Sequence, residues 1–220
     1  MNRLTADHIE KYLDKRKVLQ DISLSLEGGQ VYGFVGRNGS GKTMLFRALA
    51  GLIRLQGGQI SYNGVDLGRN TFVLPSLGLI IENTGLYGEF TGYQNLQMLA
   101  KIKQIIGKEE MVTALKRVGL DPGDKRRVAK YSLGMKQRLA IAQAIMEKPE
   151  VLMLDEPTNG LDQEGVERLR TIIREEKQRG AIILLASHSR EDIALLSDVI
   201  YQLEEGKITG VMENNAKDNV

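Results

Sequence analysis

Apolar and polar residues alternate in short segments along the first third of the chain, a pattern typical of β-strands. Within residues 16–26 the apolar side chains occupy mostly alternate positions, as expected for a half-buried strand. Residues 30–36 and 77–81 are short apolar runs that predict buried strands. Asn63-Gly64 lies between strand-like flanks and predicts a hairpin turn, and residues 42–52 predict a helix.

The middle of the chain, from residue 91 to residue 148, changes to helical periodicity. A first helix is expected around residues 96–106, a second over 108–120 and a third after Ser132. The expected apolar faces of the first and third helices consist of Leu96, Leu99, Ile102 and Ile106, and of Met135, Leu139, Ala142 and Met146.

After Pro149 the pattern returns to alternating strands and helices. Residues 150–155 and 181–187 predict strands, with a helix over 163–180 between them and a hairpin over 199–210. Strands that alternate with helices predict an α/β fold with a largely parallel sheet.

A single domain with one helical insertion accounts for this order of elements. Residues 1–85 and 149–212 are expected to form its core, and residues 86–148 the helical subdomain. Residues 213–220 are expected to be a polar tail.

The composition limits the kind of protein that this chain can be. It has 220 residues, 42% of them hydrophobic, enough for a core without cross-links, and no cysteine for disulfides or thiolate metal sites. The formal net charge is only +2, so a nucleic-acid partner is not expected. The basic runs 15–17 and 125–127 are interpreted as solvated loops, with a phosphate-binding patch as the alternative.

No apolar run approaches the roughly 20 residues that a membrane-spanning helix needs. The chain is therefore expected to be soluble and to act at a membrane only through a partner polypeptide.

Residues 36–43, GRNGSGKT, match the phosphate-binding pattern G-x-x-x-x-G-K-[ST] between a predicted strand and a predicted helix. The glycines let the backbone turn its N–H groups onto phosphate oxygens, and the helix N-terminus favours the same anion. Lys42 is expected to reach the β- and γ-phosphates, and Thr43 to place its hydroxyl on Mg²⁺. The alternative is a glycine-rich turn with an exposed lysine. The predicted nucleotide-binding residues of this segment are Gly36, Arg37, Asn38, Gly39, Ser40, Gly41, Lys42, Thr43 and Met44.

Two acids follow the buried run 151–154, at the end of a strand where ligands of open α/β sheets bind. Asp155 is expected to hold Mg²⁺ and Glu156 to polarise the attacking water; the alternative is a strand that leaves the core through charged residues. His188 follows the next buried run and is expected to contact the γ-phosphate, although a lone histidine is often a surface residue. The predicted catalytic residues are Glu156, His188 and Lys42.

Ser132-Leu133-Gly134 begins a helix with a serine hydroxyl and free N–H groups at the positive end of the helix dipole. This is a second candidate anion site in the chain. Judged from Ser132 alone, helix capping is the favoured interpretation. The alternative is a head-to-tail dimer in which each copy's helix end covers the ATP of the other copy.

The segments GRNGSGKT, YSLGMKQR, VLMLDEPTNGLD and ASHS, in this order and spacing, resemble the nucleotide-binding subunit of an ATP-binding cassette (ABC) transporter over nearly the whole chain. The resemblance implies a P-loop NTPase core with an N-terminal antiparallel β subdomain and an inserted α-helical subdomain. YSLGM keeps Ser132 and Gly134 of the family's Leu-Ser-Gly-Gly-Gln signature, and it departs from that signature at Tyr131, Leu133 and Met135.

The resemblance also implies ATP and Mg²⁺ as ligands and a second ATPase copy as partner, with a homodimer or a heterodimer left open. Ser132 and Gly134 of one copy would contact the ATP held by the other, and Asp162 would cross the interface toward the partner's P-loop. Tyr12 would stack on adenine, with packing under the sheet as the alternative reading.

Glu82 stands where the family usually has a glutamine that touches Mg²⁺ and the attacking water. Mg²⁺ accepts carboxylate oxygens, so the predicted metal ligands are Thr43, Glu82 and Asp155. A glutamate at this position resembles the ATPases of bacitracin-type and lantibiotic-immunity exporters.

The function that the resemblance implies is ATP hydrolysis that powers a separate transmembrane permease, with an antimicrobial peptide or a drug as the exported substrate. The chain would lie in the cytoplasm, on the inner face of the cell membrane. One alternative is a non-transport ABC-type ATPase that acts on a soluble partner. Another is a binding module without hydrolysis, against which the complete set of Lys42, Asp155, Glu156 and His188 argues.

Overall fold

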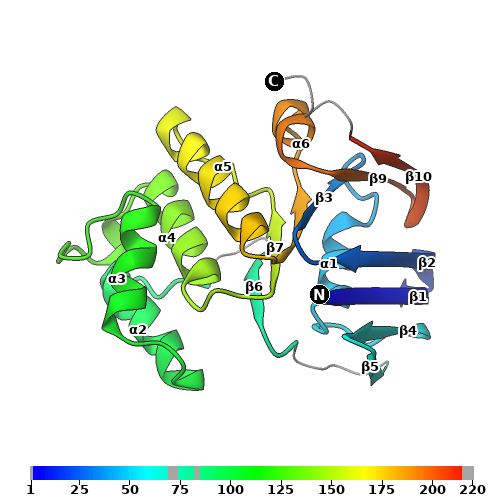
Figure 1. Ribbon diagram of the computed structural model, residues 1–220, viewed down its shortest axis with the longest axis horizontal. Helices are drawn as coiled ribbons and strands as arrows, with labels where there is room; N and C mark the ends of the chain where they lie inside the picture. The colour runs from blue at the N-terminus through cyan, green and yellow to red at the C-terminus, as the bar shows by residue number, and fades with distance from the viewer. Residues whose placement is uncertain (1, 69–73, 82–84, 215–220) are drawn as a thin grey trace.

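Four strands near the N-terminus form an antiparallel sheet in the order β2-β1-β4-β5 (Figure 1). The computed structural model that gives this arrangement describes residues 2–68, 74–81 and 85–214, so Glu82 lies outside the described residues. Tyr62 pairs with Val65 across Asn63-Gly64, which confirms the predicted hairpin. The strands are β1 (Arg3–Leu13), β2 (Arg16–Glu27), β4 (Gly57–Tyr62) and β5 (Val65–Gly68).

Strand β1 is an element that the sequence analysis does not predict. Leu4 and Ile9 are both fully buried, although residues an odd number of positions apart point to opposite faces of a regular strand. The pairing with β2 shifts register between Ala6 and Ile9, and His8 has a left-handed φ of 48°. This irregularity returns Ile9 to the core face and interrupts the alternation by which strands are predicted.

A second sheet has the order β10-β9-β3-β8-β7-β6, with β10 antiparallel to β9 and the other neighbours parallel. Every residue of β7 and β8 is buried, which explains their continuous apolar sequences. The strands are β3 (Gln30–Val35), β6 (Leu77–Ile80), β7 (Val151–Asp155), β8 (Ile182–Ala186), β9 (Val199–Glu204) and β10 (Lys207–Glu213).

The two faces of the second sheet contribute to two separate hydrophobic cores. Val151 and Met153 of β7 pack into the core between the two sheets, which also contains α1. Leu152 and Leu154 pack into the core that contains α5 and α6. The sequence analysis predicts α1 and α5 but assigns no element to α6. The three helices are α1 (Lys42–Leu49), α5 (Gln163–Gln178) and α6 (Arg190–Leu196).

Three helices between β6 and β7 lie together on one side of the molecule, away from the antiparallel sheet (Figure 1). The expected apolar face of α4 is confirmed, since Leu139, Ala142 and Met146 are buried. The expected face of the first helix is partly wrong: α2 ends before Ile106, and Ile102 is 74% exposed. The helices are α2 (Gly92–Lys103), α3 (Lys108–Arg117) and α4 (Leu133–Ile145), with a 3₁₀ turn over Val128–Lys130.

The predicted α/β fold is confirmed, with its N-terminal antiparallel sheet and its inserted helices. The boundaries proposed for the core, the helical subdomain and the tail stay a prediction. Among the described residues, no helix combines the length and the apolar character that crossing a bilayer requires.

Candidate functional site

A cavity of about 910 Å³ lies at the carboxyl ends of the parallel strands β3 and β7. Its lining includes every residue from Asn38 to Met44, together with Asp155, Glu156 and His188. Because β3 and β7 run parallel, their carboxyl ends lie at the same edge of the sheet. Ligands of open α/β sheets bind at this edge. The tertiary structure therefore brings together the three predicted chemical segments.

The loop before α1 is built to receive an anion. Gly39 and Gly41 have left-handed φ values of 78° and 109°, and Gly41 caps α1 without any side-chain hydrogen bond to its first N–H groups. The Nζ atom of Lys42 donates to the carbonyl of Gly36 at 2.8 Å, so the cation is held on the loop itself. The hydroxyl of Ser40 is buried and has no hydrogen-bond partner within the described residues. Unused donors around a buried cation fit the phosphates of a nucleotide.

Thr43 and Asp155 meet on one side of this loop. The Thr43 hydroxyl donates to Oδ2 of Asp155 at 2.6 Å, and Asp155 is buried. Hard oxygen atoms of this kind suit Mg²⁺, which commonly takes one or two protein ligands and completes its shell with phosphate and water. The described residues accordingly contain no cluster of three or more His, Asp or Glu side chains that could hold a metal alone.

Glu156 and His188 form a pair beside the cavity. The His188 backbone N–H donates to Oε2 of Glu156 at 3.2 Å, and Nε2 of its ring lies 3.3 Å from Oε1. Burial raises the pKa of Glu156 above its usual range, and the neighbouring Asp155 carboxylate acts in the same direction. A carboxylate with increased proton affinity in the lining of this cavity is suited to orient or deprotonate a water molecule.

The family comparison agrees with this chemistry. A family model described as "ABC transporter" matches residues 19–159, more than half of the chain. The chain belongs to the ABC transporter family. The resemblance inferred from the motifs is confirmed.

Several characterised and uncharacterised ABC proteins are similar to this chain. An uncharacterised ABC transporter ATP-binding protein of Bacillus subtilis, YybJ, is 45% identical over 91% of the chain and 92% of its own length. The lantibiotic transport ATP-binding protein SrtF of Streptococcus pyogenes is 36% identical over 99% of the chain and 93% of its own length. The bacitracin transport ATP-binding protein BcrA of Bacillus licheniformis is 40% identical over 91% of the chain and 66% of its own length.

Solved ABC structures share the whole fold. The ATP-binding subunit of an ABC transporter superposes with a TM-score of 0.86 at 26% identity, covering 97% of this chain and 90% of its own. The dimeric cassette MJ0796, bound to ADP and Pi, has a TM-score of 0.86 at 17% identity, with coverage of 96% and 99%. Because MJ0796 is only 17% identical to this chain, its likeness shows the fold alone.

The ABC signature segment lies outside the nucleotide cavity of its own chain. Ser132 caps α4 by accepting a hydrogen bond from the Met135 N–H at 3.2 Å, so the capping role is confirmed. Neither Ser132 nor Gly134 lines the cavity, and Leu133 between them is 70% exposed. A contact with the ATP of a second copy stays a prediction.

The signature helix packs tightly against the turn that follows Glu156. Nε2 of the buried Gln137 donates to the carbonyl of Pro157 at 2.9 Å. Asp162 caps α5 through the Gly165 N–H and pairs with Arg138, whose hydrogen bond holds the pKa of that carboxyl below its usual range. Gln137 also lines the cavity and is a site residue that the sequence analysis missed, because α4 carries other polar residues as well and nothing local distinguishes this one.

Tyr12, expected to stack on the adenine base, is not part of the cavity lining. Its side chain is 40% exposed and lies beside the ammonium of Lys17. Arg16 and Lys17 do line it, and both belong to β2 rather than to the solvated loop that the sequence analysis favours for residues 15–17. Val18 and Gln20 complete this wall. Adenine stacking on Tyr12 stays a prediction.

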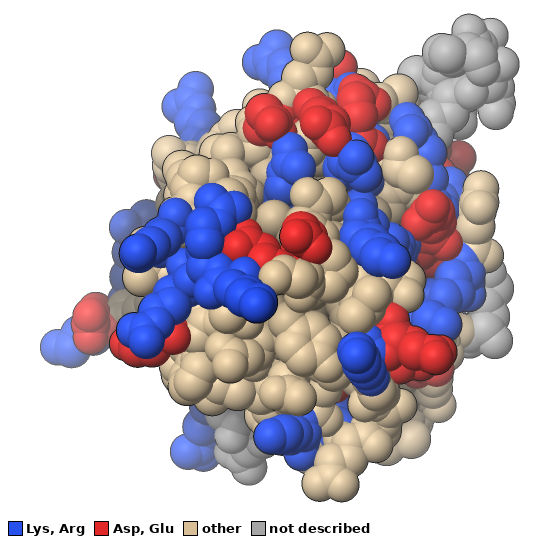
Figure 2. Space-filling model, turned by 90° about the vertical axis from the view of Figure 1, so that its left-hand side faces the viewer, with Lys and Arg blue, Asp and Glu red and all other residues tan. Residues whose placement is uncertain are grey.

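The second basic run, 125–127, lies on the side of the molecule formed by the helices. Arg126 pairs with Asp124, and Lys125, Arg127 and Lys130 line a hollow beside them. Figure 2 shows this side with Lys and Arg side chains lying among Asp and Glu side chains. The solvated-loop reading and the phosphate-binding alternative both stay open for this run.

Proposed function

We propose that this chain is the ATP-hydrolysing subunit of an ABC transporter that drives a separate membrane permease. The observation that carries the proposal is the meeting of Lys42, Thr43, Asp155, Glu156 and His188 at one cavity of nucleotide size. Each of these side chains carries a group that can bind phosphate, Mg²⁺ or water. Membership of the ABC transporter family supports ATP hydrolysis as the reaction.

The loop over residues 36–44 would hold the phosphates of ATP. Lys42 exchanges its bond to the Gly36 carbonyl for bonds to β- and γ-phosphate oxygens, and the free N–H groups at the start of α1 hold the same anion. Thr43 and Asp155 would hold Mg²⁺, with Glu82 as a third candidate ligand. Mg²⁺ supplies charge neutralisation and orientation of the phosphates when it is bound.

Glu156 would orient the attacking water and accept its proton, and His188 would contact the γ-phosphate. The raised pKa of Glu156 makes it a better proton acceptor than an exposed carboxylate. The backbone N–H of His188 holds one oxygen of that carboxylate and its ring lies 3.3 Å from the other, so the same residue orients Glu156 and lines the cavity.

A second ATPase copy would complete the site. Exposed Leu133 and the helix start at Ser132 and Gly134 form a surface that the chain itself leaves uncovered. In a head-to-tail dimer this surface and Asp162 would cover the ATP of the partner. The dimeric form of the cassette MJ0796, which has the same fold, supports this arrangement.

A permease would bind on the side formed by α2 and the segment before it. Large apolar side chains are exposed there, which favours contact with a partner. They are Tyr87, Phe90, Met98, Ile102 and Ile105. The subunit would then sit in the cytoplasm against the inner face of the cell membrane. The relatives SrtF and BcrA support an antimicrobial peptide of the lantibiotic or bacitracin kind as the exported substrate.

The test is a pull-down of the tagged chain from detergent-solubilised native membranes. Recovery of a multi-span polypeptide in stable ratio, and stimulation of ATPase activity by that polypeptide, are the expected results. A soluble dimer that hydrolyses ATP without any membrane partner would instead support the non-transport alternative.

A further inference from the structure

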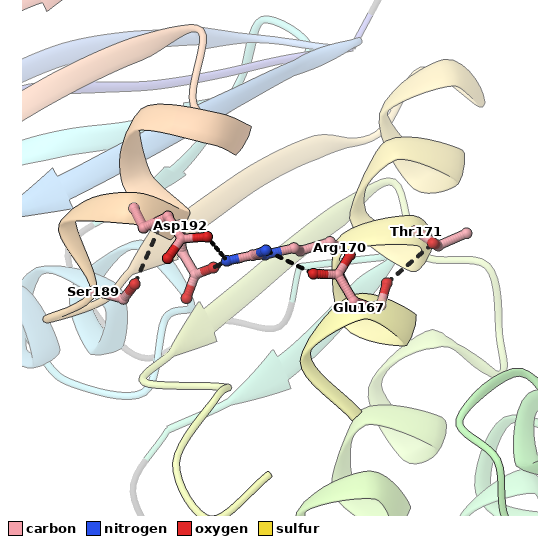
Figure 3. Close-up of polar contacts among 6 residues, drawn as sticks. Glu167, Arg170, Thr171, Ser189 and Asp192 are labelled. Carbon is pink, nitrogen blue, oxygen red and sulfur yellow. Dashed lines mark hydrogen bonds and ion pairs between the residues drawn. The ribbon is translucent and has the colours of Figure 1, made fainter. Parts of the chain in front are cut away.

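Arg170 in the middle of α5 is a buried cation that the proposed reaction does not use. Its side chain is only 11% exposed and reaches across to the first turn of α6 (Figure 3). Nε and Nη2 donate to Oδ1 of Asp192 at 2.9 and 2.7 Å. Nη2 also donates to Glu191 and Nη1 to Glu167, so all three guanidinium nitrogens are engaged.

Asp192 connects this cation to the start of α6. Its side chain is 5% exposed, and a carboxylate so deeply buried requires a partner such as Arg170. Its backbone N–H donates to the hydroxyl of Ser189, the residue that caps α6 (Figure 3). Helix α6 has only 7 residues, too few to be stable alone, so its start is fixed by contacts of this kind.

The start of α6 in turn fixes the catalytic pair. His188 directly precedes the capping Ser189, and the Ser189 N–H is itself held by the hydroxyl of Ser187 at 3.1 Å. The backbone N–H of His188 donates to Glu156. An unbroken series of contacts therefore runs from the guanidinium of Arg170 to the carboxylate of Glu156.

We propose that Arg170 is a positioning residue that holds the start of α6, and thereby keeps His188 and Glu156 in their reactive arrangement. The inference rests on the catalytic roles proposed above for those two residues. Arg170 itself does not touch the cavity lining, so its effect is on the rate of the chemical step rather than on ATP binding.

Helix α5 offers a matched control at the other end of α6. Lys177 pairs with Asp198, just beyond the last turn of α6, at 2.6 Å. Oδ2 of Asp198 also accepts from the Val31 N–H, so that carboxylate keeps a partner when Lys177 is replaced. Lys177→Met thus removes an ion pair between α5 and the segment just after α6 without touching the start of α6.

Arg170→Lys is the principal variant, because it keeps a positive charge beside Asp192 but loses the planar fork that fixes its direction. We expect kcat for ATP hydrolysis to fall by about 10-fold or more while KM for ATP changes by less than about threefold, since small misplacements of reacting groups slow chemistry strongly. Arg170→Met should lower kcat further if it folds. Lys177→Met should leave both constants within about twofold.

A second readout does not depend on hydrolysis. The chain has two histidines, so in a His8→Ala background every imidazole NMR signal belongs to His188. We expect the ring resonances of His188 to change in Arg170→Lys and to stay the same in Lys177→Met. Unchanged His188 resonances and an unchanged kcat in a folded Arg170→Lys protein would overturn the inference. If the parent protein fails to hydrolyse ATP, the proposed function fails, and the NMR comparison still decides whether Arg170 positions His188.

Discussion

The starts of α1 and α4 are both candidate anion sites, and they are built differently. Gly41 caps α1 without a side-chain bond, in a cavity lined by a buried lysine and by a serine hydroxyl that has no hydrogen-bond partner among the residues described. Ser132 caps α4 with its own hydroxyl, next to an exposed leucine and outside that cavity. The first site therefore offers its donors within one chain, whereas the proposed role of the second depends on another copy, which stays a prediction.

The largest expected effect comes from removing the cation of the α1 site. Lys42→Ala deletes the charge that faces the phosphates, so both ATP binding and hydrolysis should be lost, with kcat reduced by at least about 100-fold. Calorimetric titration with ATP and Mg²⁺, together with an ATPase assay, measures the two separately. Retained hydrolysis would mean that the α1 site is not the place where ATP is held.

Glu156→Gln should separate binding from chemistry at the same site. The amide keeps the size of the side chain but does not accept the proton of water, so hydrolysis should fall about 100-fold or more while ATP binding persists. The ATP-bound dimer should then accumulate, as measured by light scattering with ATP and Mg²⁺. A protein that stays monomeric under these conditions would contradict the proposed two-copy site.

Ser132→Ala tests the α4 site and should have a smaller effect. Loss of the N-cap should lower the free energy of unfolding by about 1 kcal/mol. Loss of the proposed contact to the partner's ATP should lower kcat by about 10-fold, with little change in ATP binding. Thr91→Ala is the matched control, because Thr91 caps α2 in the same way. Equal losses of activity in the two variants would show that Ser132 acts as a cap alone.

The smallest expected effect is the pH dependence of the stability difference between the parent protein and Glu156→Gln. Because burial raises the pKa of folded Glu156, the folded protein binds its proton more tightly than the unfolded chain does. Protonated Glu156 therefore stabilises the folded protein fully at pH values below the pKa of the unfolded chain. This stabilisation is lost as the pH rises through the raised pKa of folded Glu156. Glu156→Gln should accordingly have a higher Tm than the parent at pH 7, and the difference should shrink as the pH approaches 4.5. A difference that grows on acidification would contradict the raised pKa.

Much of this molecule can be predicted from local sequence. The buried strands β7 and β8 are continuous apolar runs, and the loop over residues 36–43 carries its chemistry in adjacent residues. The predicted residues Lys42, Thr43, Asp155, Glu156 and His188 all line one cavity. The strands and the loop are visible in the sequence because neighbours along the chain determine them, whereas the meeting of these side chains at one cavity depends on the fold.

Other features depend on residues that are distant in sequence. The irregular register of β1 moves Ile9 to the core face, and the exposure of Ile102 reflects which side of α2 meets its neighbours. Arg16 and Lys17 form a wall of the cavity only because β2 passes over the loop before α1. Periodicity within one segment carries no information about these contacts.

By itself, the sequence determined most of the elements, β1 and α6 excepted, together with their order and the groups proposed to bind phosphate and metal, because each of these is encoded by a spacing of a few residues. The tertiary structure alone decided how those groups are held. Gln137 reaches the carbonyl of Pro157, and Arg170 reaches Asp192, across helices that only folding brings together. A buried polar side chain needs a partner, but nothing in its local sequence states which distant residue provides it.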